Sequence, residues 1–210
     1  PDAIVAYDVA TGEKRELVRD AVRDPEVVYR PGTSVPVGAR FPGAQPRTVM
    51  FNETSEDARF QRMLTGAFPG QVVEVASATH DAGSKLLLAT SDVDPGSFYT
   101  YDASLKRAAF ELGRRDQVDP GRMAPMQPIA LPARDGLQLH GWLTRPKNAA
   151  AGQPLPLVVL PHGGPFGIVD EWEFDSDTQL LAQAGYAVLR LNYRGSGGYG
   201  RSFQQAGARQ

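Results

Sequence analysis

The chain has 210 residues, a length that fits one full domain or parts of two. With 41% hydrophobic and 22% charged residues, a net charge of −2 and no basic run, its composition is ordinary for a globular protein and does not suggest a nucleic-acid surface. The longest apolar stretches, such as residues 155–160, are far too short to cross a membrane. The absence of cysteine excludes disulfides, thiolate catalysis and cysteine zinc sites.

The first half of the chain is predicted to be mostly short strands separated by turn signals. One helix interrupts them: Thr54 to Asp57 resembles a capping box, and apolar residues at helical spacing follow it as far as Pro69-Gly70. Residues 31–46 hold many prolines and glycines and are predicted to be a loop. The expected strands are residues 3–9, 13–18, 27–29, 47–51, 72–76, 85–90 and 98–101.

A weak internal repeat is visible within this half. Tyr7-Asp8 and Tyr101-Asp102 are followed by similar turns and are 94 residues apart. Two blades of a β-propeller, at roughly 40–50 residues each, would give about this interval. Chance similarity of two hairpins explains the repeat equally well, so both interpretations stay open.

The pattern changes after residues 114–128, a charged and proline-containing segment that we take as the domain boundary. Residues 129–131 and 137–144 then flank Asp135-Gly136, a strong hairpin signal. Beyond it the chain alternates between strand and helix, which predicts a parallel sheet and a second domain. The expected strands are residues 155–160, buried on both faces, and residues 186–191. Between them we expect a helix that is capped by Asp175 or Ser176 and ends at Gly185, with Leu180, Leu181 and Ala184 along one side.

The segment His162-Gly163-Gly164-Pro165 directly follows the first of these predicted strands. Acyl transfer requires N–H donors aimed at the oxygen that becomes negative in the tetrahedral intermediate. Glycine lets a substrate carbonyl approach the backbone closely and tolerates unusual φ angles. The segment therefore predicts an oxyanion element. A tight turn between strand and helix is the alternative interpretation.

A second glycine-rich segment, Asn192 to Gly200, follows the second strand. Gly195, Gly197 and Gly200 match the spacing of a dinucleotide-binding loop. That match is weak evidence, because it follows the second strand of the unit and no ribose-binding acid can be checked after it. We therefore favour a different interpretation, which depends on both segments together.

Taken together, the segments 162–165, 184–186 and 192–200 closely resemble the hydrolase domain of the prolyl oligopeptidase family, in its acylaminoacyl-peptidase and dipeptidyl-aminopeptidase-like branch. The hairpin at Asp135 and the following His140-Gly141-Trp142 are also similar to that domain. The resemblance implies the C-terminal blades of a partial β-propeller over residues 1–122. It further implies the N-terminal part of an α/β-hydrolase catalytic domain, a parallel sheet with helices, over residues 123–210.

The family resemblance also implies roles for individual residues. The backbone N–H of Gly164 would serve as one oxyanion donor in a Ser–His–Asp enzyme. His162 and Gly163 would shape the site or contact substrate. Arg194 matches the loop arginine of the family and is expected to be a structural anchor. In related branches a tyrosine side chain assists near the position of His162.

The sequence departs from a complete enzyme, because neither Ser196 nor Ser202 lies in a G-x-S-x-G pattern. We expect all three triad residues to be missing, so that this chain is an internal fragment and inactive alone. His80 and His140 are expected to have packing or surface roles. The acids at 170–177 are expected to form a solvated loop that leads into a helix cap, in preference to a metal site.

The leading functional hypothesis is a serine peptidase that cleaves short or acylated peptides through an acyl-enzyme. The alternatives are a carboxylesterase acting on small esters and a non-catalytic propeller that binds partners. We expect a peptide substrate, no metal, no cofactor, no nucleic acid and no membrane; the oligomeric state stays open. The compartment also stays open between cytoplasm and periplasm, since a targeting signal could precede Pro1.

Overall fold

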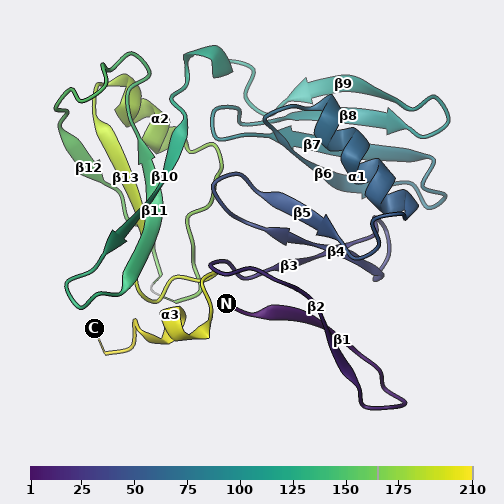
Figure 1. The fold of residues 1–210 in the computed structure, drawn as a ribbon. Coiled ribbons are helices and arrows are strands. Elements are labelled where there is room, and N and C mark those ends of the chain that lie inside the picture. The colour runs from purple at the N-terminus through teal and green to yellow at the C-terminus, as the bar shows by residue number, and fades with distance from the viewer. Residues whose placement is uncertain (165, 210) are drawn as a thin grey trace.

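The computed structural model describes residues 1–164 and 166–209, which form four separate sheets, and no sheet closes into a barrel in these residues (Figure 1). The first half holds three antiparallel sheets in simple chain order. Their strands are β1 (Ala3–Tyr7) with β2 (Lys14–Arg19); β3 (Glu26–Tyr29), β4 (Pro36–Phe41) and β5 (Arg47–Met50); and β6 (Val72–Ala78), β7 (Ser84–Thr90), β8 (Ser97–Asp102) and β9 (Arg107–Gly113).

The second half contains a mixed sheet whose strand order is β10-β11-β13-β12. After a short 3-10 turn at Pro120–Arg122, its elements are β10 (Met126–Pro132), β11 (Gln138–Thr144), β12 (Leu157–Val159), α2 (Ser176–Gln183), β13 (Ala187–Asn192) and α3 (Arg201–Gln205). Strands β12 and β13 are parallel with α2 between them, as predicted, and β10 and β11 form the predicted hairpin. No helix in the described residues is long and apolar enough to span a membrane.

Strand β4 corrects the prediction that residues 31–46 are a loop. It pairs with both β3 and β5, and its residues Ala39 and Phe41 are 0% and 2% exposed. At Gly38 an added Cβ would lie 2.6 Å from the carbonyl oxygen of Val49 in β5. The glycine that reads as a loop signal is therefore needed for close approach of two strands.

Helix α1 (Glu56–Ala67) lies against the sheet β6-β7-β8-β9 (Figure 1). Its N-cap is Ser55, whose hydroxyl accepts from the backbone N–H of Ala58 at 3.1 Å, so the cap lies one residue after the start of the predicted box. Leu64 of the helix joins Leu87 and Tyr101 of the sheet in a buried cluster. This cluster fixes the helix and makes the sheet the core of the first half.

Two predictions for the second sheet are wrong. Strand β12 lies at the edge, and Leu157 and Val159 are 55% and 53% exposed, because nothing in the described part of the chain covers them. In α2 the buried residues are Thr178, Gln179 and Ala182, whereas Leu180 is 69% exposed. The Gln179 side chain explains why this face of the helix is buried. Its oxygen accepts from the N–H of Ala124 and its NH2 group donates to the carbonyl of Ala124, each at 2.8 Å.

Candidate active site

The loop that follows β12 carries the predicted oxyanion segment. The amide of Leu160 still donates to Leu189 at 2.8 Å, after which the chain leaves the sheet. Gly164 is exposed, lies outside the strands and has φ +144°, a region that favours glycine. The backbone at Gly164 is thus free of sheet pairing, as an oxyanion donor requires.

The orientation of the peptide between Gly163 and Gly164 follows from its carbonyl. The hydroxyl of Tyr193 shares its one proton between the carbonyl oxygens of His162 at 2.9 Å and Gly163 at 3.2 Å, and His162 Nδ1 lies 2.6 Å from the Gly163 oxygen. The described peptides are all trans, so the C=O and the N–H of one peptide point in opposite directions. The N–H of Gly164 therefore points away from His162 and Tyr193.

The His162 side chain is held by the second glycine-rich segment. Its ring stacks on Tyr193 with centroids 4.5 Å apart, and its Nε2 lies 2.8 Å from the hydroxyl oxygen of Ser196. Because the carbonyl of Gly163 can only accept, Nδ1 donates to it, and Nε2 forms the second hydrogen bond of the ring with the Ser196 hydroxyl. His162 thus fixes the loop with both ring nitrogens.

Sequence reasoning missed Tyr193 and Ser196 as parts of this site. Besides its contact to Gly163, the Tyr193 hydroxyl is 2.9 Å from the carbonyl oxygen of His162, and Ser196 is 0% exposed. Both follow β13 directly, at the end of the sheet where the oxyanion loop begins. Polar residues immediately after a parallel strand are the signal that could have identified them.

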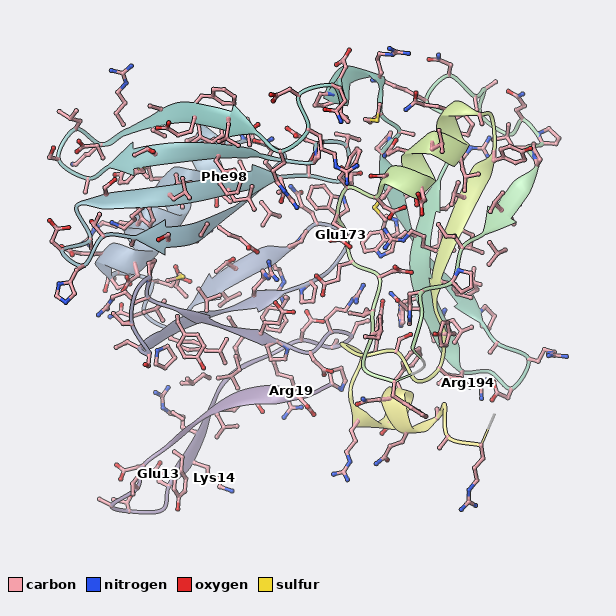
Figure 2. All side chains as sticks on the ribbon, turned by 180° about the vertical axis from the view of Figure 1, so that it is seen from behind. Glu13, Lys14, Arg19, Phe98, Glu173 and Arg194 are labelled. Carbon is pink, nitrogen blue, oxygen red and sulfur yellow. The ribbon has the colours of Figure 1, made fainter. Side chains whose placement is uncertain are left out.

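Arg194 does not join this group of contacts. Its guanidinium donates to Asp135 at 2.8 Å and so links the loop after β13 to the turn of the β10–β11 hairpin, at the end of the sheet near α3 (Figure 2). The hydrogen bond from Arg194 lowers the pKa of Asp135 from 3.8 to about 2. The contact joins two loops of the second half, and the role of Arg194 as a structural anchor stays a prediction.

The acids after the oxyanion loop are only partly solvated, which corrects the prediction for Asp170. Asp170 is 5% exposed and forms an ion pair with Arg190, which is 7% exposed. Asp175 caps α2 by accepting from Thr178 at 2.7 Å. Burial raises the pKa of Glu171. In residues 1–164 and 166–209 no group of three or more His, Asp or Glu side chains is arranged to hold a metal ion.

The remaining histidines have different surroundings. His140 stacks on Tyr199 with centroids 4.7 Å apart and an angle of 9° between the rings, and burial lowers its pKa. His80 is exposed in the turn after β6. Neither contacts His162 in the described structure, in agreement with packing and surface roles.

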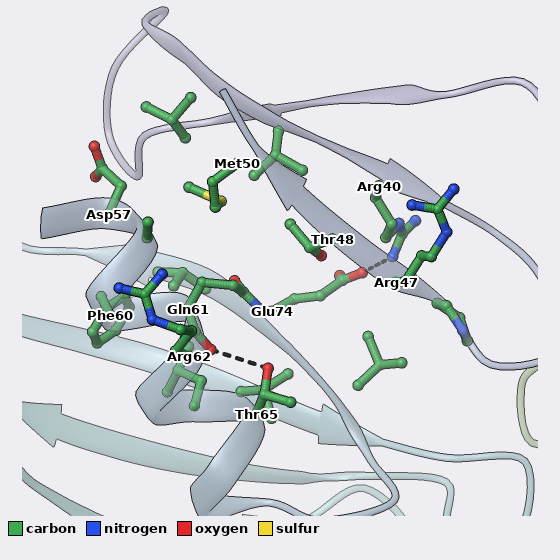
Figure 3. Close-up of a pocket in the computed structure, with 18 of the residues that line it drawn as sticks. Arg40, Arg47, Thr48, Met50, Asp57, Phe60, Gln61, Arg62, Thr65 and Glu74 are labelled. Carbon is green, nitrogen blue, oxygen red and sulfur yellow. Dashed lines mark hydrogen bonds and ion pairs between the residues drawn. The ribbon is translucent and has the colours of Figure 1, made fainter. Parts of the chain in front are cut away.

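A cavity of about 950 Å³ lies between the sheet β3-β4-β5 and the elements α1 and β6 (Figure 3). Its charged side chains are paired, as between Arg40 and Glu74 and between Arg62 and Glu53. A smaller cavity of about 290 Å³ is lined by residues of both halves, among them Glu173. Figure 2 shows Glu173 between the two halves. Neither cavity is lined by the residues of the oxyanion loop from His162 to Gly164.

Comparison with known proteins agrees with the resemblance seen in the sequence. Residues 172–210 match the model of the prolyl oligopeptidase family. Dipeptidyl aminopeptidase BIII of Pseudoxanthomonas mexicana is 34% identical over 225 aligned positions, which cover 98% of this chain and 30% of that protein. Dipeptidyl-peptidase 5 of Schizosaccharomyces pombe is 25% identical and is aligned over 95% of this chain and 29% of its own length.

Solved structures show the same fold. A prolyl endopeptidase structure superimposes with a TM-score of 0.65 at 18% identity, and the match covers 98% of this chain and 30% of the endopeptidase chain. A puromycin hydrolase superimposes with a TM-score of 0.60 at 24% identity, and the match covers 97% of this chain and 32% of the hydrolase. The chain thus spans about 30% of the length of these relatives. The predicted resemblance is confirmed: residues 172–210 match the prolyl oligopeptidase family, and nearly the whole chain is similar in sequence to a dipeptidyl aminopeptidase and in fold to a prolyl endopeptidase.

Proposed function

We propose that the complete protein is a serine peptidase that cleaves short or acylated peptides through an acyl-enzyme, and that Gly164 supplies one oxyanion N–H. The observation that carries this proposal is the fixed peptide between Gly163 and Gly164. Tyr193 and His162 hold its carbonyl, which directs the N–H to the opposite side. A donor that is already oriented costs no reorganisation when charge develops on the substrate.

In this proposal the chain contains parts of two domains. Residues 1–122 form C-terminal blades of a β-propeller, and residues 123–210 begin an α/β-hydrolase domain. The successive antiparallel sheets of the first half and the parallel pair β12 and β13 with α2 between them support this division. The likeness to the prolyl endopeptidase fold also supports it.

The chemical role that we assign to this chain is to stabilise the negative charge that develops on the substrate oxygen. A serine of the complete protein would attack the substrate carbonyl, whose oxygen becomes negative and accepts from Gly164 N–H. The second donor and the Ser–His–Asp triad would come from other parts of the protein, since no G-x-S-x-G pattern occurs in residues 1–210. Gly163 gives room for the substrate, because a Cβ added there would meet nothing within 4 Å.

Substrate size follows from the proposed architecture and from the relatives. A propeller over the active site would exclude large folded proteins. The relatives include a dipeptidyl aminopeptidase and a puromycin hydrolase, whose names refer to a dipeptide and to puromycin, both small molecules. We therefore propose peptides of a few residues as the substrate class.

Turnover of a dipeptide anilide and of a short acyl ester by the complete protein tests the proposal. A peptidase should turn over the anilide and be labelled at one serine by a fluorophosphonate. Turnover of the ester alone would instead indicate a carboxylesterase, and no labelling would indicate a non-catalytic binding protein. Residues 1–210 expressed alone should not be labelled, and labelling of that piece would contradict the proposed absence of the nucleophile.

A further inference from the structure

A second, buried attachment lies beyond the oxyanion loop, at Asp170. Its backbone N–H donates to Asn192 Oδ1 at 2.7 Å, and its carbonyl accepts from Asn192 Nδ2 at 2.9 Å. The indole N–H of Trp142 donates to the same carbonyl at 3.1 Å. The carboxylate pairs with Arg190. Asp170 is thus bound to three side chains of the sheet.

All of these partners are almost completely inside the protein. Asn192 is 0% exposed, Trp142 1%, Asp170 5% and Arg190 7%. Desolvation makes such an ion pair a poor source of net stability, since apolar residues of similar volume often stabilise a protein at least as well. In the described structure Asp170 Oδ2 and Arg190 Nη1 also lack a hydrogen-bond partner. The pair is therefore better explained by what it positions than by stability alone.

Contacts between the two loops connect this attachment to Gly164. The amide of Gly167 donates to Gly195 at 3.1 Å, and the amide of Gly197 donates to Ile168 at 3.0 Å. Further along, Ser196 and Tyr193 hold His162 and Gly163 as described above. The residues from His162 to Gly164 and the residues from Gly167 to Asp170 are thus both held by β13 and the loop that follows it, and Asp170 is also held by Trp142 of β11.

We propose that Asp170 is a positioning residue that keeps the amide of Gly164 aimed at the developing oxyanion, an inference that rests on the proposed peptidase function. If the buried attachment loosens, the residues from Gly167 to Asp170 can move away from β13, and the Gly164 amide can be displaced with them. Errors of about 1 Å in the position of a reacting group can cost about a hundredfold in rate. The effect should fall on the transition state, because only there does the substrate oxygen carry the charge.

The test uses Asp170→Asn in the complete protein, which keeps the shape of the side chain and removes its charge. Arg190 then still has Glu173 at 3.9 Å. We expect kcat for the dipeptide anilide to fall by about 10- to 100-fold, as expected for a displaced oxyanion donor, while KM stays within about threefold. The kcat is calculated per active site titrated with a fluorophosphonate. A purely structural defect would lower the number of sites and leave kcat per site unchanged.

The control is Asp57→Asn, which removes a charge paired with Arg30 in the first half of the chain. Its kcat per site should match the wild type. If Asp170→Asn does not fold, Trp142→Phe takes its place, because it deletes only the bond to the carbonyl of Asp170, and a smaller fall in kcat is then expected. Wild-type kcat per site in the folded variant overturns the inference. An inactive wild-type protein would instead contradict the proposed function.

Discussion

The hydroxyl of Tyr193 donates to the carbonyl of His162 at 2.9 Å, while the rings of the two residues stack 4.5 Å apart. The same hydroxyl reaches the carbonyl of Gly163, so one side chain after β13 orients two consecutive peptides of the oxyanion loop. The loop depends on this residue for the direction of its Gly164 amide. Tyr193 is therefore the most direct place to disturb the proposed oxyanion donor without changing the donor itself.

Tyr193→Phe removes the hydroxyl and keeps the stacked ring. Each lost hydrogen bond is worth about 1 kcal/mol, which predicts a fall in kcat/KM of about fivefold to tenfold for the complete protein. Hydrolysis of a dipeptide anilide measures it. Tyr7→Phe, at an exposed tyrosine of the β1–β2 hairpin, should leave activity unchanged. Equal activity of the two variants would show that the hydroxyl does not orient the loop.

Gly164→Ala tests the donor itself. At φ +144° an alanine is strained by about 1–3 kcal/mol, and its Cβ would lie 3.4 Å from Phe166 N and Tyr193 Oη. We expect kcat to fall by at least about tenfold, since relief of the strain turns the peptide. Gly32→Ala is the matched control, because Gly32 also has a positive φ, +73°, and an added Cβ there meets nothing within 4 Å. An active Gly164→Ala enzyme would argue against the assignment.

Much of the fold can be predicted from the sequence because its strands are short, alternate regularly and are separated by turn residues. The hairpin at Asp135-Gly136 and the β12–α2–β13 unit are confirmed. Strand β4 could not be predicted, because Gly38 signals a loop while in fact it admits a neighbouring strand. The buried face of α2 was also missed, since a polar Gln179 outweighs an apolar Leu180 once it satisfies backbone groups of Ala124.

The candidate site, like the fold, can be predicted from the sequence only in part. His162, Gly163 and Gly164 are contiguous, so their motif is visible in the sequence. The contacts that orient them come from Tyr193 and Ser196, about thirty residues away, and depend on where β13 delivers the following loop. Pairing over such a separation is a property of the tertiary structure, and no local pattern encodes it.

Asp135 should give a stability difference that depends on pH. Its folded pKa is held at about 2 by the hydrogen bond from Arg194, below its ordinary value of 3.8. The stabilisation is therefore fully present above pH about 4 and is lost as pH falls through about 2. Asp135→Asn should melt below the wild type at pH 6 and approach it as the pH drops towards 2. A difference that persists at acid pH, or that resists high salt, would contradict this electrostatic origin.

Asp24 joins the first half of the chain to the loop before α3. Its carboxylate accepts from the amide of Gly200 at 2.8 Å, and its own amide donates to Gly198 at 2.9 Å. Asp24→Ala should cost about 1–3 kcal/mol of unfolding free energy and speed hydrogen exchange at residues 198–200. Asp102→Ala is the control, because Asp102 accepts only from Ser104 and Leu105 of its own turn, and exchange at 198–200 should not change.

His140 should weaken the protein as the pH falls below neutrality. Burial, with a smaller contribution from the positive charge of Arg23, lowers its pKa below 6.5 in the folded state. Between that lowered value and 6.5 the unfolded chain binds more protons, so the unfolding free energy decreases as the pH drops through this window. Above pH about 6.5 both states are neutral at this side chain, and the stability contribution is complete.

His140→Phe keeps an aromatic ring against Tyr199 and removes the titrating group. The variant should lose less stability than the wild type between pH 7 and 5, measured by denaturant unfolding at each pH. Glu171, whose pKa burial raises, acts in the opposite direction as pH falls, but it is present in both proteins and cancels in the difference. Identical curves for wild type and His140→Phe would mean that His140 titrates as it does in the unfolded chain, and that the stacking on Tyr199 does not exclude its charged form.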